Sequence, residues 1–288
     1  MENKENKEEQ TPVVALDIRT ENKTGYDFLY DICKNVRNKG HARIGLIEPL
    51  TDRACFIVNS LNELDIPYKI TPFSLENETQ AGYGLGKLIN IEVFFPATEK
   101  TEKSIFFTAH HDIANPRSEN CQDNTASVCN LIDLCQVVSK METRTKNVYI
   151  VFTDCEETGG LGMNRLIHDI QRRNIDVELM LCLELTANGT EYWASGTRNE
   201  AMNKFLALVE NKDAIVGTPY NESLNARRSG LNAICVGSLS KSEMESAVKR
   251  GFCNTWGLCH SESDTFELSA NRQEMSDFVQ FLKRFINE

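Results

Sequence analysis

Short apolar runs that alternate with amphipathic segments are the feature that most restricts the fold of this 288-residue chain. Near-continuous apolar runs are typical of strands that are buried on both faces of a sheet. Four such runs are SIFFTA (104–109), VYIVFT (148–153), LMLCLEL (179–185) and LNAICVG (231–237). Apolar residues at helical spacing predict helices over 123–140, 163–173, 200–211, 243–250 and 273–286. This alternation predicts an α/β fold with helices on both faces of the sheet.

The first hundred residues extend the same pattern. Helical spacing predicts helices over 24–38 and 52–64, and extended segments follow near 68–71 and 89–95, with a polar, glycine-rich loop or turn between them at 75–87. Residues 1–12 are charged, and we expect a disordered tail there. Residues 13–288 contain no linker and no repeat. We therefore expect a single three-layer α/β/α catalytic domain, rather than two domains divided near residue 100.

Composition limits the partners and the compartment. The formal net charge of -11 argues against nucleic-acid binding and against a basic membrane-surface patch, and no apolar run is long enough to span a membrane. None of the ten cysteines forms a CxxC motif, and the sequence starts without an apolar leader. We expect a cytoplasmic protein with free thiols, the alternative being a disulfide-bonded secreted protein. The sequence leaves the oligomeric state open.

Acids and histidines follow the predicted strands, at the positions where an α/β fold gathers its reactive groups. The set comprises His110, Asp112, Asp123, Glu156, Glu157, Glu184 and His260. Imidazole and carboxylate groups are ligands that zinc accepts. The set supplies five candidate metal ligands, one further carboxylate as a base, and one acid to orient a histidine. It therefore indicates a hydrolase with two zinc ions.

The residues in the first half of this set also have simpler interpretations. Residues i and i+2 of a strand point to the same side, so Asp112 could hold the ring of His110. An isolated H-x-D sequence is more often a surface pair, and His111 is a competing candidate ligand. Asp123 alone could be a helix N-cap. A capping Asp needs no second acid nearby, so the other acids decide its role, and a carboxylate can bridge two metal ions.

The interpretation of the acids in the second half of the set depends on the buried strands that precede them. Glu156 and Glu157 follow a buried strand, where charges need partners, and one could bind metal while the other faces the substrate water. Glu184 is the only acid in the run 179–187, although an ion pair with a core Arg or Lys is the alternative. His260 lies in a polar loop. It is a candidate metal ligand only because it completes the set of ligands that the other residues form.

Four stretches carry a resemblance to a known family. They are TAHHD (108–112), CQDNTAS (121–127), VFTDCEETGGLG (151–162) and LCHSESDTFELS (258–269). With them the chain resembles, over roughly residues 24–286, the co-catalytic two-zinc aminopeptidases of the bacterial leucyl aminopeptidase type. Relatives of these enzymes include glutamate carboxypeptidases and glutaminyl cyclases. The resemblance implies a single α/β/α domain with a mixed, mostly parallel sheet of about eight strands.

The resemblance also implies a role for each ligand. His110 and Glu184 would bind one zinc ion, Glu157 and His260 would bind the other, and Asp123 would bridge the two. Cobalt or manganese could replace zinc, because both suit ligands of this kind. The peptide bond that follows Asp123 is implied to be cis.

The implied activity is hydrolysis of peptides at the N-terminus by a metal-activated water. Glu156 would be the general base, and Asp112 would orient the histidine ligand His110. The chain departs from the family at Glu184, where these aminopeptidases usually have Asp, and at residues 221–223, where N-E-S replaces S-D-H.

Three other functions compete with an aminopeptidase. A carboxypeptidase would need a cation for the substrate carboxylate, and Arg227 and Arg228 are the candidates. A glutaminyl cyclase would use one zinc ion and a narrow pocket. The third alternative is a non-catalytic binding protein on the same scaffold, which a chain that takes up no metal would favour.

Overall fold

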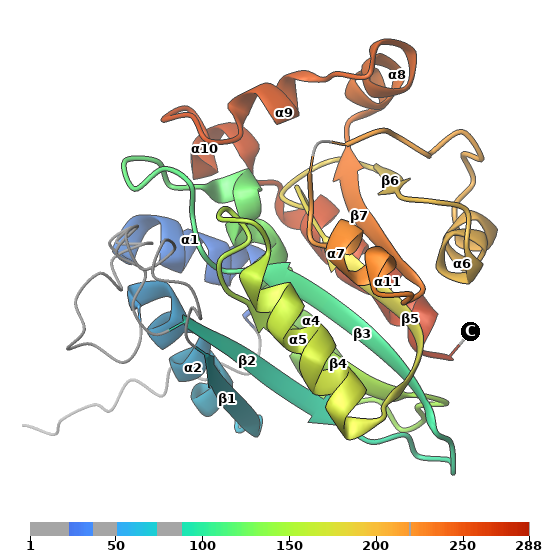
Figure 1. The fold of residues 1–288 in the computed structure, drawn as a ribbon. Coiled ribbons are helices and arrows are strands. Elements are labelled where there is room, and N and C mark those ends of the chain that lie inside the picture. Colours follow the sequence, from blue (N-terminus) through green and yellow to red (C-terminus); the bar gives the residue numbers. More distant parts are fainter. Residues whose placement is uncertain (1–22, 37–50, 74–87, 219, 288) are drawn as a thin grey trace, which may run out of the picture.

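The computed structural model describes residues 23–36, 51–73, 88–218 and 220–287. In this part of the chain a single mixed sheet has seven strands in the order β1-β2-β4-β3-β5-β7-β6 (Figure 1). The strands are β1 (Tyr68–Phe73), β2 (Leu88–Phe95), β3 (Lys103–His110), β4 (Asn147–Thr153), β5 (Asp176–Leu183), β6 (Glu191–Ser195) and β7 (Ala233–Leu239).

The centre of the sheet is parallel and its two edges are antiparallel. Strand β3 pairs in parallel with β4 and β5, and β5 pairs in parallel with β7. Strands β1 and β2 form one antiparallel edge, and β6 forms the other against β7. The predicted mixed, mostly parallel α/β sheet is therefore confirmed.

Helices cover both faces of the sheet (Figure 1). Each face has its own apolar core, because successive strand residues point to opposite sides. Phe107 belongs to the larger core and its neighbour Phe106 to the smaller one. The larger core includes side chains of α1 (Gly25–Asn35), α2 (Asp52–Glu63), α4 (Ala126–Ser139), α6 (Glu200–Leu208), α8 (Lys241–Arg250) and α11 (Arg272–Asn287). The smaller core lies under α5 (Leu161–Arg173) and α7 (Ser223–Arg228).

Three local features differ from the sequence-based expectations. The helix predicted from residue 123 begins at Ala126, because Asp123 and Asn124 have non-helical backbone angles within a π-type turn, Cys121–Thr125. Strand β6 was missed because its apolar run is only three residues long, and α7 because six residues are too few to show a helical period. The short helices α9 (Asn254–Leu258) and α10 (Phe266–Ser269) were missed for the same reason.

The carboxyl ends of three adjacent parallel strands deliver the candidate residues to one edge of the sheet. His110 is the last residue of β3, Glu184 follows directly after β5, and the Glu156–Glu157 pair lies three residues beyond the end of β4. The predicted tail 1–12 and the predicted loop 75–87 lie outside the described residues. All ten cysteines are free thiols, as predicted. Among the described helices, none has the length and apolarity required to cross a membrane.

Candidate metal centre and catalytic site

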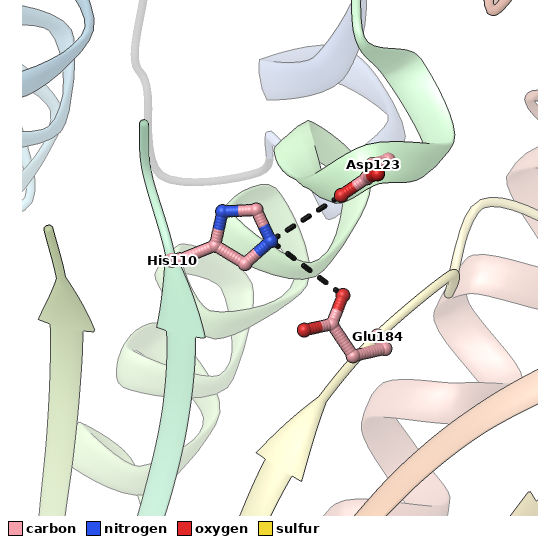
Figure 2. A group of neighbouring side chains, drawn as sticks. All are labelled: His110, Asp123 and Glu184. Atoms are coloured by element: carbon pink, nitrogen blue, oxygen red, sulfur yellow. Dashed lines mark ion pairs between the residues drawn. The ribbon is translucent and has the colours of Figure 1, made fainter. Parts of the chain in front are cut away.

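His110 is held on one side of its ring and faces acids on the other. Its Nδ1 lies 3.4 Å from Oδ1 of Asp112, while its Nε2 lies 3.3 Å from Oδ1 of Asp123 and 3.6 Å from Oε2 of Glu184 (Figure 2). Figure 2 shows the ring at the end of its strand, directed toward the two carboxylates. This is the arrangement of a ligand histidine whose second nitrogen is fixed by a carboxylate.

Asp112 also fixes the backbone that carries the adjacent glutamates. The N–H of Glu156 donates to Oδ1 of Asp112 at 3.0 Å, and the N–H of Glu157 donates to Oδ2 at 3.2 Å. Asp112 is fully buried. The carboxylate of Asp112 thus contacts both the His110 ring and the Glu156–Glu157 turn. A shift of this carboxylate would therefore displace both parts of the site.

Asp123 lies between two histidines. Its Oδ1 faces His110, and its Oδ2 lies 3.2 Å from Nε2 of His260. The same nitrogen of His260 lies 3.1 Å from Oε2 of Glu157. The peptide bond between Asp123 and Asn124 is cis, as the resemblance implied. With one oxygen directed to each histidine, Asp123 has the orientation of a bridging carboxylate.

The competing candidate His111 points elsewhere. Its Nε2 lies 3.1 Å from the carbonyl oxygen of Ile89 at the start of β2, and the side chain is buried. The His111 ring is therefore directed toward the backbone of β2, and its neighbour His110 is the histidine that reaches the acids.

Sequence reasoning missed two acids around this cluster. Asp264 accepts the N–H of Gln122 at 2.8 Å and that of Asp123 at 3.1 Å, so it holds the turn that carries Asp123. Glu222 is buried, with Oε2 3.5 Å from the hydroxyl of Thr108. Asp264 lies four residues after His260, within the stretch LCHSESDTFELS (258–269), and this position near a candidate ligand could have identified it. Glu222 is the middle residue of the N-E-S departure.

The protonation of the cluster reflects crowded, buried charge. Burial raises the pKa of Glu156 to about 10, an effect that His110 opposes and Glu184 reinforces. Burial and the charge of Asp123 raise the pKa of Glu157 to about 7. The hydrogen bond to Asp123 raises the pKa of His260 to about 9. In the metal-free protein these groups hold protons that bound cations would displace.

The donor set fits two divalent cations. His110, Asp123 and Glu184 place ligand atoms within 4.8 Å of one another, and so do Asp123, Glu157 and His260. Asp123 belongs to both groups. Among the described residues, Oε1 of Glu157 is buried without a hydrogen-bond partner, which leaves an acceptor free for a cation.

Glu156 stands beside the two groups rather than within either of them. It forms a third group with His110 and Glu157, and its side chain lines the same cavity. The cavity has a volume of about 390 Å³. Its wall consists of His110, Asp123, Glu156, Glu157, Gly159, Glu184, Leu185, Trp193, Thr218, Tyr220, Asn221, Cys235, Trp256, Cys259 and His260.

The family model that matches this chain is Peptidase family M28, over residues 90–286. The chain belongs to this peptidase family. The matched region holds every residue of the cluster described above. No curated protein matches the sequence.

Solved structures share the M28 fold of this chain at low identity. LapB of Legionella pneumophila superposes with a TM-score of 0.68 at 14% identity, over 91% of this chain and 70% of its own. A glutaminyl cyclase of Porphyromonas gingivalis has a TM-score of 0.66 at 14% identity, over 91% and 96%. A leucine aminopeptidase precursor of Bacteroides thetaiotaomicron has a TM-score of 0.66 at 13% identity, over 91% and 95%.

Proposed function

We propose that this M28 family member is a zinc-dependent aminopeptidase with two metal ions. The observation that carries the proposal is the position of Asp123, whose two oxygens each face a different histidine at the floor of a cavity. In this proposal His110 and Glu184 hold one ion, and Glu157 and His260 hold the other. Cobalt or manganese would fit the same nitrogen and oxygen ligands.

Glu184 takes the place of the usual Asp in this proposal. Its Oε2 lies 3.6 Å from Nε2 of His110, and its N–H donates to the carbonyl of Val236. The following residue, Leu185, has a φ of 58°. The longer side chain therefore still brings its oxygen to the histidine from a strand end that is tied to β7.

When bound, zinc lowers the pKa of a water and polarises the scissile carbonyl. Glu156 accepts the proton of the attacking water and delivers it to the leaving amine. Asp112 keeps the Glu156–Glu157 backbone and the His110 ring in register throughout. The burial that raises the pKa of Glu156 in the metal-free protein makes its carboxylate strongly basic, and nearby cations would lower this pKa toward neutrality.

The charge of the cavity supports recognition of a free amino group. Among the described residues that line it there is no Lys or Arg, whereas several are acidic. A substrate carboxylate would find no cationic side chain among these residues, and an α-ammonium group would find carboxylates. Leu185, Trp193 and Cys235 supply apolar wall next to the acids, which suits an uncharged first side chain.

The carboxypeptidase alternative loses its sequence-based support. Nε of Arg227 donates to the carbonyl oxygen of Ser223, and neither Arg227 nor Arg228 lines the cavity. The glutaminyl cyclase alternative keeps support from the likeness to the Porphyromonas gingivalis enzyme. The number of bound zinc ions separates the cyclase from the proposed aminopeptidase, because the cyclase alternative requires one zinc ion and the aminopeptidase requires two.

Cleavage of matched peptides with free and acetylated N-termini tests the proposal. We expect zinc-loaded protein to release N-terminal residues from the free peptides only, and to contain two zinc ions per chain. Release from the C-terminus of blocked peptides would establish a carboxypeptidase. Cyclisation of N-terminal glutamine with one zinc ion would establish a cyclase. Two bound ions without any reaction would favour a binding protein.

A further inference from the structure

A buried arginine lies behind the candidate metal centre, and no step above uses it. Arg53 belongs to the first turn of α2, and 2% of its surface is exposed. Burial of a guanidinium costs several kcal/mol in general, and a positive charge at a helix N-terminus opposes the helix dipole. Two hydrogen bonds of Arg53 reach outside the helix and help to offset these costs.

These two hydrogen bonds reach the segments that carry metal ligands. Nε of Arg53 donates to the carbonyl oxygen of His111 at 3.0 Å, one residue beyond His110. Nη2 donates to the hydroxyl of Thr125, two residues beyond Asp123. The planar guanidinium, with its fixed fork of donors, thus joins the end of β3 to the turn Cys121–Thr125.

The charge of Arg53 also matches its surroundings. Asp112 and Asp264 both interact electrostatically with the guanidinium. These are the two acids whose oxygens hold the backbone N–H groups of the Glu156–Glu157 turn and of Asp123. A positive charge at this place favours their ionised forms, which are the better acceptors.

We propose that Arg53 is a positioning residue of the metal centre, which holds the His110–Asp112 segment and the Cys121–Thr125 turn at the spacing that the ligands need. The inference rests on the metal site of the proposed function. It assigns to α2 a part in metal binding, although α2 contributes no ligand.

The test compares Arg53→Met, Arg53→Lys and the wild type by zinc competition with a chromogenic chelator. We expect Arg53→Met to bind zinc at least tenfold more weakly, with kcat reduced more than KM is raised. Arg53→Lys should recover part of the affinity, because it keeps the charge and loses the fork. Equal zinc affinity in all three proteins would overturn the proposal.

Lys146→Met is the matched control. Lys146 is a buried cation at the opposite end of the sheet, where Nζ donates to the carbonyl oxygens of Phe285 and Ile286. Its loss should lower the unfolding midpoint and leave zinc affinity unchanged. If Lys146→Met weakens zinc binding as much as Arg53→Met, the effect is general destabilisation and the positioning role is rejected.

Amide hydrogen exchange of the metal-free proteins separates this inference from the proposed function. We expect Arg53→Met to exchange faster in segments 110–112 and 121–125 and to match the wild type in α11. Unchanged exchange in both segments would overturn the inference whatever the zinc result, whereas a wild type that binds no zinc would overturn the proposed function. Thr125→Val removes one acceptor of Arg53, and should show the same pattern more weakly if Arg53→Met does not fold.

Discussion

At the scale of single residues, Glu156 and Glu157 show how one turn separates two roles. They are adjacent in sequence, and Asp112 holds the N–H group of each. Only Glu157 pairs with His260, while Glu156 lines the cavity beside the cluster. The proposed base and the proposed ligand can therefore be removed independently by mutation.

Glu156→Gln should retain both zinc ions and lose turnover. The amide cannot accept the proton of the attacking water, and general bases contribute about 10²–10⁴-fold to rate. Metal analysis and steady-state kinetics on one peptide measure the two quantities. Glu157→Gln is the control, and it should lose metal as well. Near-normal turnover of Glu156→Gln would remove Glu156 from the base role.

Asp112→Asn should weaken zinc binding and turnover together. The amide N–H₂ group of Asn replaces one of the two carboxylate oxygens and cannot accept. Either the N–H of Glu157, or the N–H of Glu156 together with Nδ1 of His110, therefore loses its acceptor. Loss of such a supporting carboxylate typically costs 10–100-fold in metal affinity. Chelator titration gives the affinity. An unchanged dissociation constant would show that His110 is held adequately without Asp112.

At the scale of elements, sequence patterns predicted the helices and strands whose positions depend on neighbouring residues in the chain. The apolar strands were recognisable, and the acids at their ends followed from the rule for parallel sheets. The start of α4 was predicted three residues early, because its cause is remote. Asp264 accepts the N–H groups of Gln122 and Asp123 from 142 and 141 residues away, respectively. The buried positions of Arg53 and Glu222 could not be predicted either, because their partners lie in other segments of the chain.

Asp264→Asn should loosen the turn Cys121–Thr125. Asn has one acceptor oxygen for two N–H groups, so one buried N–H loses its partner at a cost of about 1–3 kcal/mol. Urea unfolding of the metal-free protein measures this loss of stability, and zinc affinity should fall with it. Ser263→Ala, one residue away and exposed, is the control. Equal stability of Asp264→Asn and Ser263→Ala would contradict the clamp role.

At the scale of the whole molecule, clustered charge sets the pH dependence of stability. Burial raises the pKa of Glu222 from 4.5 to about 7. The folded state therefore holds this proton more tightly than the unfolded chain. The corresponding stability is complete below pH 4.5 and is lost as pH rises to about 7. The raised pKa values of Glu156, Glu157 and His260 act in the same direction.

The metal-free protein should thus become less stable between pH 5 and pH 8, with Glu222 alone contributing on the order of 3 kcal/mol. Urea unfolding after chelation of metal measures the trend. Glu222→Gln should show a shallower decline, because it cannot titrate. Stability that rises over this range would contradict the protonation states described here. Zinc should reverse the trend, since ligands must lose their protons to bind it.

The described residues of the cavity wall include no Lys or Arg, and a chain of net charge -11 stays negative when two divalent cations bind, which has a consequence for encounter rates. Its field extends about 10 Å into 0.1 M salt and draws cations toward the mouth before contact. For a peptide with Lys at its second position, kcat/KM should exceed that of a Gln peptide in dilute buffer. The ratio should approach one as salt is added, and a salt-independent ratio would place the preference in direct contacts instead. If the preference does fall with added salt, ionic strength sets which peptides bind to the enzyme fastest.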